Sequence, residues 1–186
     1  MKIRKLTPEN HARVAALLRQ AFPGSTYEEQ LFENFHKNGT PVHEWVCLHT
    51  NTVIAYIAFS NAYNGSVVCG LHLAPLAVKP EFQKQGTGSE LLRFALRQDG
   101  IKENTIFVLG DPGFYKRFGF EPCAMPICPF DKNKGHFLSI RNNTTSQFTV
   151  GYEPEFSIAT QGGQGKGGSR LSRKKSQGKK WHRSAK

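Results

Sequence analysis

The stretch from residue 71 to residue 93 constrains the fold most, because it joins three elements in a fixed order. The apolar run at residues 71–78 is typical of a buried strand, and leucine periodicity predicts a helix over about residues 86–98. Between them lies Gln83-x-x-Gly86-x-Gly88. Glycines at a helix start let backbone N–H groups approach an anion closely, and the helix dipole favours negative charge there. This order of elements predicts a site for a phosphate-bearing ligand.

Helices and strands alternate along the chain. The expected helices cover residues 7–22, begin again at residue 25, and cover about residues 86–98 and 111–119. The expected strands are residues 2–6, 44–50, 52–61, 67–79, 105–109, 119–125, 136–141 and 147–152. Interleaved strands and helices indicate an α/β or α+β class with a mostly central sheet.

The positive charge of the chain gathers in one segment. Of the 25 Lys and Arg residues, nine lie within residues 160–186, which contain no Asp or Glu. The remaining sixteen basic and fourteen acidic residues give the rest of the chain a net charge of about +2. The segment is rich in Gly, Ser and Lys, and its few apolar side chains cannot offset the entropy of ordering it. We therefore expect one domain over residues 1–158 and a disordered basic tail over residues 159–186, which either contacts RNA or the ribosome or acts as a solubilising extension.

The four cysteines, Cys47, Cys69, Cys123 and Cys128, lie in apolar surroundings. Because Cys123 and Cys128 lack a second close pair, their spacing disfavours zinc, and we expect no metal. Buried reduced thiols are typical of cytosolic proteins. The first residues contain no apolar core of a signal peptide, and no apolar run approaches membrane-spanning length. We expect a cytoplasmic protein that has no membrane partner.

The glycine motif at residues 83–88 and a second motif at residues 109–120 together indicate a family more specifically than either motif alone. No acidic residue follows the glycines at the position that a dinucleotide fold requires, and no Gly-Lys-Ser/Thr follows them as in a nucleotide P-loop. Over residues 1–155 the chain instead resembles the GNAT superfamily of acyl-CoA-dependent N-acetyltransferases, in a bacterial branch whose substrates are mostly unassigned. The resemblance is carried by Leu76-Ala77-Val78, Pro80, Gln83-x-x-Gly86-x-Gly88 and LGDPGFYKRFGF at residues 109–120. It implies a mixed, mostly antiparallel sheet, splayed at the acyl-CoA site and flanked by about four helices.

The resemblance also implies acetyl-CoA as the co-substrate. The amides of residues 84–89 would receive the pyrophosphate, and the pantetheine arm would pair with the strand at Leu76 and Val78. Pro75 cannot donate to a ladder, which is consistent with a bulge that opens the sheet. The implied acetyl-CoA residues are Leu76, Ala77, Val78, Gln83, Lys84, Gln85, Gly86, Thr87, Gly88, Ser89 and Tyr115. The alternative is that Gly86 and Gly88 only allow a tight strand-to-helix turn.

Acetyl transfer to an amine needs a neutral amine, a polarised carbonyl and a proton for the leaving thiolate. At pH 7 a lysine-like amine costs ~4.6 kcal/mol to deprotonate, whereas an α-amine costs only ~1 kcal/mol. The resemblance implies Tyr115, four residues before Gly119, as the acid, and the backbone amide of Leu76 as the oxyanion donor. By alternation His72 shares the side-chain parity of Leu76 and falls where some family members carry a glutamate base, whereas many use water. Tyr115 and His72 could each instead be core residues.

Two classes of function follow. The first is an N-acetyltransferase that moves an acetyl group from acetyl-CoA directly to a primary amine of a small molecule, peptide or protein in a ternary complex. The second is a nucleic-acid- or ribosome-associated binding protein on a non-catalytic acetyltransferase fold, contacting its partner through the basic tail. The intact glycine loop and Tyr115 favour the enzyme. The acceptor is not predicted, because the regions that would shape its pocket match nothing diagnostic.

Overall fold

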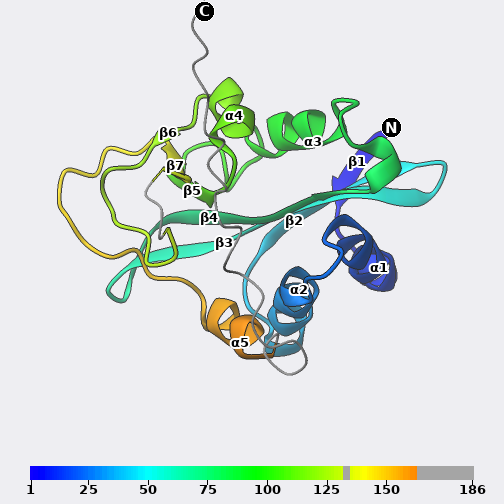
Figure 1. The fold of residues 1–186 in the computed structure, drawn as a ribbon, viewed down its shortest axis with the longest axis horizontal. Helices are drawn as coiled ribbons and strands as arrows, with labels where there is room; N and C mark the ends of the chain where they lie inside the picture. Colours follow the sequence, from blue (N-terminus) through cyan, green and yellow to red (C-terminus); the bar gives the residue numbers. More distant parts are fainter. Residues whose placement is uncertain (132–134, 163–186) are drawn as a thin grey trace, which may run out of the picture.

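A seven-stranded sheet with helices on both faces forms the body of the protein (Figure 1). The computed structural model describes residues 1–131 and 135–162. The strands are β1 (Lys2–Lys5), β2 (His43–His49), β3 (Thr52–Asn64), β4 (Val67–Val78), β5 (Ile106–Leu109), β6 (Glu121–Pro122) and β7 (Phe137–Ile140). The α-helices are α1 (His11–Ala21), α2 (Tyr27–Asn38), α3 (Thr87–Ala95), α4 (Pro112–Tyr115) and α5 (Pro154–Gly162). Helices α1, α2 and α5 cover one face, and α3 and α4 cover the other. None of the helices in the described ranges is long and apolar enough to cross a membrane.

Neighbouring strands run antiparallel except for one pair. The strand order is β1-β2-β3-β4-β5-β7-β6, and β4 and β5 are parallel. Parallel neighbours need a crossover connection, which α3 provides here while packing on β2, β3 and β4. The turn between β2 and β3 falls at Thr50 and Asn51, which both have positive φ, where the predicted strands at residues 44–50 and 52–61 meet. The expected mixed, mostly antiparallel fold is confirmed.

Strands β4 and β5 separate soon after they meet. Their pairing joins Leu71 to Ile106 and His72 to Phe107, and β4 then continues to Val78. Gly70 allows this close approach, because a Cβ there would lie 2.6 Å from the backbone oxygen of Thr105, the residue before β5. Beyond the second pair the strands diverge and leave a gap in the sheet. This gap is the splay that the resemblance implies.

A bulge in β4 changes which face its side chains occupy. Between Leu73 and Leu76, two residues of β4 oppose the single Ala58 of β3. One of the two is Pro75, which has no N–H for the ladder, so the bulge falls where the sequence predicts it. Leu73 and Leu76 consequently both pack on the α3 face, whereas the ring of His72 lies on the α5 face. The predicted shared parity of His72 and Leu76 is therefore wrong, because the bulge shifts the alternation by one residue.

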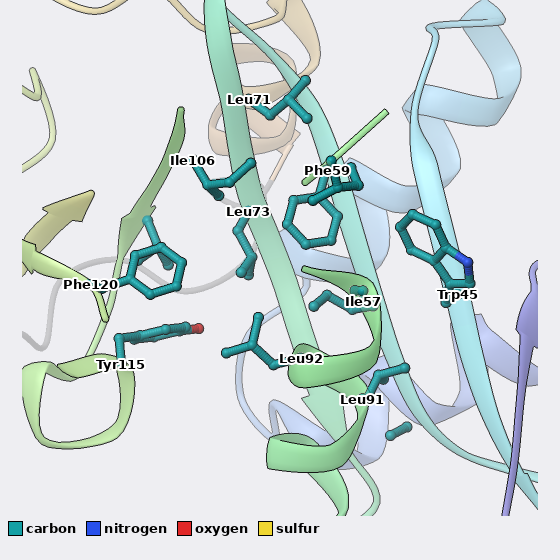
Figure 2. Packing of buried hydrophobic residues seen from close by; sticks show 14 of the residues in the cluster. Trp45, Ile57, Phe59, Leu71, Leu73, Leu91, Leu92, Ile106, Tyr115 and Phe120 are labelled. Carbon is teal, nitrogen blue, oxygen red and sulfur yellow. The ribbon is translucent and has the colours of Figure 1, made fainter. Parts of the chain in front are cut away.

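The main core lies between α3 and the sheet (Figure 2). Leu91 and Leu92 of α3 point toward Ile57 and Leu73 of the sheet, and Tyr115 approaches from the side of α4. Leu91, Leu92 and Ile57 are fully buried. Each such side chain contributes about 1.5–3 kcal/mol relative to an exposed one, so this layer fixes α3 against the strands.

The last part of the chain differs from the sequence predictions. Residues 147–152 form isolated bridges, Ile127 with Thr149 and Tyr63 with Gly151, instead of a continuous strand. Helix α5 was not predicted, and it continues through residue 162, so the predicted tail beginning at residue 159 starts inside a helix. Ala159 is fully buried against α2, and this contact outweighs the polar composition. The predicted tail from residue 163 to 186 lies outside the described residues.

Candidate active site

A cleft of about 550 Å³ lies beside the amino end of α3; we call it the α3 cleft. Its lining residues are Leu76, Val78, Gln83, Lys84, Gly86, Thr87, Gly88, Ser89, Asp111, Phe114, Tyr115 and Arg117. Nine of the eleven residues predicted for acetyl-CoA are therefore brought together in one hollow. The other two lie apart: Ala77 is buried among residues that pack on α1, and the side chain of exposed Gln85 donates to the carbonyl of Glu81. Asp111, Phe114 and Arg117 also line the cleft, and no sequence pattern marked these three residues as part of the site.

The loop before α3 is folded so that its amides lie at the helix end. Lys84 and Gly86 have positive φ, 58° and 87°, and Gly86 is the N-cap. The amide of Glu90 bonds the carbonyl of Gly86 at 2.9 Å, so the three preceding amides have no partner within the helix. Gly88 keeps the cleft open, because a Cβ there would lie 3.1 Å from Val78 Cγ2. Donor groups at a helix start favour an anion.

The backbone of β4 faces the gap at Leu76 and Val78. In an antiparallel ladder, hydrogen-bonded and non-hydrogen-bonded pairs alternate. The amide of Lys79 donates to the carbonyl of Ile54 at 2.8 Å. Ala77, two residues earlier, is therefore also a position whose backbone bonds β3, whereas the residues on either side of it do not bond β3. These two residues are Leu76 and Val78, and their N–H and C=O groups point away from β3. The side-chain amide of Gln83 agrees with this, because it donates to the Val78 carbonyl at 3.0 Å.

Two cations and one engaged carboxylate give the α3 cleft its charge. Lys84 and Arg117 line it, and the Arg117 guanidinium lies 5.0 Å from the ring centre of Phe114. Asp111 caps α4 by accepting a hydrogen bond from the amide of Gly113 at 2.9 Å. The cleft therefore favours an anionic ligand. Among the described residues, no three His, Cys, Asp or Glu side chains gather as a metal site would require.

Tyr115 lines the α3 cleft and is largely buried. Its ring packs edge-on against Phe114 and Phe120 and is 9% exposed, and Figure 2 shows the hydroxyl pointing toward β4. Burial, and secondly the charge of Asp111, raise its pKa far above the ordinary value for tyrosine. The hydroxyl is therefore protonated at neutral pH and can donate a hydrogen bond. Gly110 makes room for the ring, because a Cβ there would lie 2.5 Å from Tyr115 Cε2.

His72 lies on the opposite face of the sheet. Its ring stacks on Tyr152 at 3.7 Å between centres, and its Nε2 lies 3.0 Å from the carbonyl oxygen of Gly151. A carbonyl only accepts, so Nε2 carries the proton and Nδ1 does not. Burial lowers the pKa of His72 to about 4, against a smaller opposing effect of the Gly151 bond. The ring is consequently neutral at pH 7.

A second hollow, of about 280 Å³, adjoins His72; we call it the aromatic cavity. Its rings are those of Tyr27, His72, Phe107, Phe130, Tyr152 and Phe156, which come from α2, both diverging strands, the two loops on either side of β7, and α5. Apart from His72, none of these residues was a candidate from the sequence. The six rings are spread over 130 residues of chain, so no local pattern marks them.

The chain is similar to acetyltransferases in sequence. A family model described as "Acetyltransferase (GNAT) domain" matches residues 41–122. YhbS of Escherichia coli (strain K12), named an uncharacterized N-acetyltransferase, is 33% identical over 129 residues, which cover 67% of this chain and 75% of YhbS. YjhQ of the same strain, named likewise, is 37% identical over 94 residues, which cover 47% of this chain. The match spans about half of YjhQ, 51% of its length.

Solved structures share the fold. The crystal structure of YhbS from Escherichia coli in complex with CoA has a TM-score of 0.76 and 28% identity, covering 84% of this chain and 91% of that one. A GNAT family acetyltransferase from Brucella melitensis in complex with acetyl-CoA has a TM-score of 0.69 and 26% identity, covering 83% of this chain and 97% of that one. An aminoglycoside 6'-N-acetyltransferase complexed with coenzyme A, 16% identical with a TM-score of 0.53, shows the shared fold alone.

Proposed function

The chain belongs to the GNAT family of acetyl-CoA-dependent N-acetyltransferases, and from this premise we propose that it moves an acetyl group from acetyl-CoA directly to a primary amine in a ternary complex. One observation carries the proposal. The α3 cleft joins an anion-binding loop to the outward-facing backbone of Leu76 and to the protonated hydroxyl of Tyr115. These are the features that binding and cleavage of a phosphate-bearing thioester require.

The cleft residues fit the parts of acetyl-CoA. The amides of residues 84–89, with Lys84 and Arg117, would bind the phosphates. The C=O of Leu76 and the N–H of Val78 would pair with the amides of the pantetheine arm, as an added strand pairs with a sheet edge, and the Leu76 N–H stays available for the thioester oxygen. The two relatives crystallised with CoA and acetyl-CoA support this assignment by analogy of fold and sequence.

The transfer divides into three tasks for this chain's residues. The Leu76 amide donates to the thioester oxygen as the amine nitrogen bonds to the carbonyl carbon. As the carbon–sulfur bond breaks, Tyr115 donates its proton to the sulfur and regains one from solvent. The amine loses a proton in the same sequence, so atoms and charge balance. A neutral phenol suits this role because it brings no charge near the thioester.

The structure favours water over His72 as the final proton acceptor. An ammonium of pKa ~10.4 lies about six units above the His72 pKa of about 4, so transfer to the ring is unfavourable by ~9 kcal/mol. The unprotonated Nδ1 can instead accept a hydrogen bond from the incoming amine. We therefore give His72 a positioning role, and the amine proton passes to solvent.

The test is transfer and binding measured on the same full-length protein. We expect acetyl-CoA to bind by calorimetry and thiol release to appear with at least one amine in a panel, with the acetylated product identified by mass spectrometry. Absence of acetyl-CoA binding would contradict the site. Binding without transfer to any amine would favour the non-catalytic alternative.

A nucleic-acid- or ribosome-associated binding protein is the second class of function that the sequence predicts. It depends on the basic segment at residues 160–186, most of which lies outside the described residues. RNA or ribosome contact and a cytoplasmic location are likewise predictions from the sequence.

A further inference from the structure

The aromatic cavity and the α3 cleft reach one opening in the sheet from opposite faces. The cavity lining includes Leu73 of β4 and Val108 and Leu109 of β5, which follow the last paired residues of the two strands. The α3 cleft reaches β4 at Leu76, just past the bulge. A group held in the aromatic cavity therefore has access to the gap that the outward-facing Leu76 amide borders.

The walls of the aromatic cavity suit a flat apolar group, because aromatic side chains form most of them. Tyr152 is at their centre: it stacks on His72, meets Phe130 edge-on at 4.9 Å, and meets Phe156 edge-on at 5.0 Å. Offset and edge-on ring contacts of this kind add about 0.5–1.5 kcal/mol to the burial of a further ring. Phe130 is 45% exposed, so it lies at the mouth of the cavity.

The described lining residues carry no charge that could balance an additional ammonium group on an acceptor with more than one amine. Its ten residues include no Asp, Glu, Lys or Arg, and His72 is neutral at pH 7. The two nearby carboxylates do not line the cavity. Glu153 accepts from Asn61 and from the hydroxyl of Tyr63, and Glu155 accepts from Asn38 and Thr40 through Oε1, while its buried Oε2 has no partner among the described residues. Burying an unpaired cation here would cost several kcal/mol, which disfavours polyamines and other polycations.

The size of the cavity limits the acceptor further. A dry cavity of about 150 Å³ holds benzene, so 280 Å³ holds one ring with a short chain. Building on the proposed acetyl transfer, we propose that the aromatic cavity binds the acceptor, and that this acceptor is a small arylalkylamine with a single amino group. The ring lies among Tyr152, Phe156 and Phe130, and the amine reaches the gap between β4 and β5.

The experiment compares 2-phenylethylamine with spermidine and with a peptide that begins with phenylalanine. For each, thiol release gives kcat/KM, and calorimetry on the acetyl-CoA-saturated protein gives binding that does not depend on turnover. We expect kcat/KM for 2-phenylethylamine to exceed that for spermidine by at least about tenfold. Phe130→Ala should raise the KM for 2-phenylethylamine about tenfold and leave acetyl-CoA affinity unchanged. Ile158→Ala, a comparably exposed position of α5 that does not line the cavity, is the matched control and should change neither.

The outcomes separate the acceptor proposal from the acetyltransferase proposal. Preference for spermidine, preference for the peptide, or an unchanged KM in Phe130→Ala would overturn the acceptor class while transfer itself stands. Binding of 2-phenylethylamine that Phe130→Ala weakens, without transfer to any amine, would uphold the cavity and overturn the acetyltransferase. Absence of 2-phenylethylamine binding to the acetyl-CoA complex would overturn the cavity assignment directly.

Discussion

At the scale of single residues, burial decides what Tyr115 can do. Its raised pKa means that the hydroxyl acts as a donor and never as a phenolate at working pH. Tyr115→Phe removes the proton but keeps the ring packing on Phe114 and Phe120. We expect kcat to fall roughly ten- to a hundredfold with little change in the Kd for acetyl-CoA, measured by thiol release and calorimetry. An unchanged kcat, with chemistry shown to be rate-limiting, would show that Tyr115 only packs in the core and does not act as the acid.

Gly110 controls the position of that hydroxyl. Because a Cβ at this residue would lie 2.5 Å from Tyr115 Cε2, Gly110→Ala must displace the ring. We expect a fall in kcat of about tenfold. The double variant with Tyr115→Phe provides the control, because misplacing a ring without a hydroxyl should cost little further rate. Equal losses in both backgrounds would show that Gly110 acts on the fold and not through Tyr115.

The buried, neutral His72 makes stability depend on pH. In the unfolded chain a histidine titrates near its ordinary value of 6.5, whereas in the folded protein the pKa is about 4. Below pH 6.5 the unfolded state therefore binds more protons, and the free energy of unfolding falls as pH drops toward 4, by up to about 3 kcal/mol from this group. Urea unfolding at pH 7 and pH 4.5 should show a smaller loss in His72→Gln than in the wild type. An equal loss in both would assign the acid sensitivity to other groups.

At the scale of elements, the sequence predicted what local patterns determine. The strand, loop and helix at residues 67–95 and the hairpin turn at Thr50 and Asn51 follow from periodicity, glycine and proline. Helix α5 could not be predicted in this way, because it is held by burial of Phe156 and Ala159 on α2. The face of His72 was missed for a related reason: alternation holds only within an unbroken ladder, and the β4 bulge breaks it.

The loop before α3 depends on the backbone conformation of Gly86. Gly86 has φ of 87°, so any side chain strains the backbone by about 1–2 kcal/mol, while open space surrounds the position. Gly86→Ala and Gly86→Glu should therefore lose similar stability in urea unfolding. The glutamate also places a negative charge at the phosphate site, so we expect calorimetry to detect acetyl-CoA binding to Gly86→Ala and none to Gly86→Glu. Equal affinities for acetyl-CoA in the two variants would show that the phosphates do not bind at this loop.

At the scale of the whole molecule, the two hollows differ in how far the sequence predicts them. The α3 cleft is formed largely by two motifs, and most of its lining was a candidate before the fold was known. The aromatic cavity is assembled from α2, β4, β5, two loops and α5. Its members become neighbours only through the strand order and the packing of α5, and neither follows from spacing along the chain.

The boundary between the body and the basic segment can be tested by truncation. The charge pattern places the tail from residue 159, but α5 extends through residue 162 and buries Ala159 against α2. A chain ending at residue 162 should keep both its melting temperature and its transfer to a small amine. A chain ending at Ser157 should lose about 2 kcal/mol, or ~4–8 °C in Tm, because it cuts the last turns of α5.

The same pair of truncations tests polyanion binding. The nine basic residues after residue 159 stand against a nearly neutral body, so any RNA affinity should be electrostatic and steeply salt-dependent. We expect the chain ending at residue 162 to lose RNA retention at low salt, since it removes all nine, while turnover persists. Loss of transfer to every acceptor in a truncated chain that stays folded would make the segment part of the active site. RNA binding that survives in the chain ending at residue 162 would place the basic surface on the remaining residues, whose nearly even balance of basic and acidic side chains gives no reason to expect it.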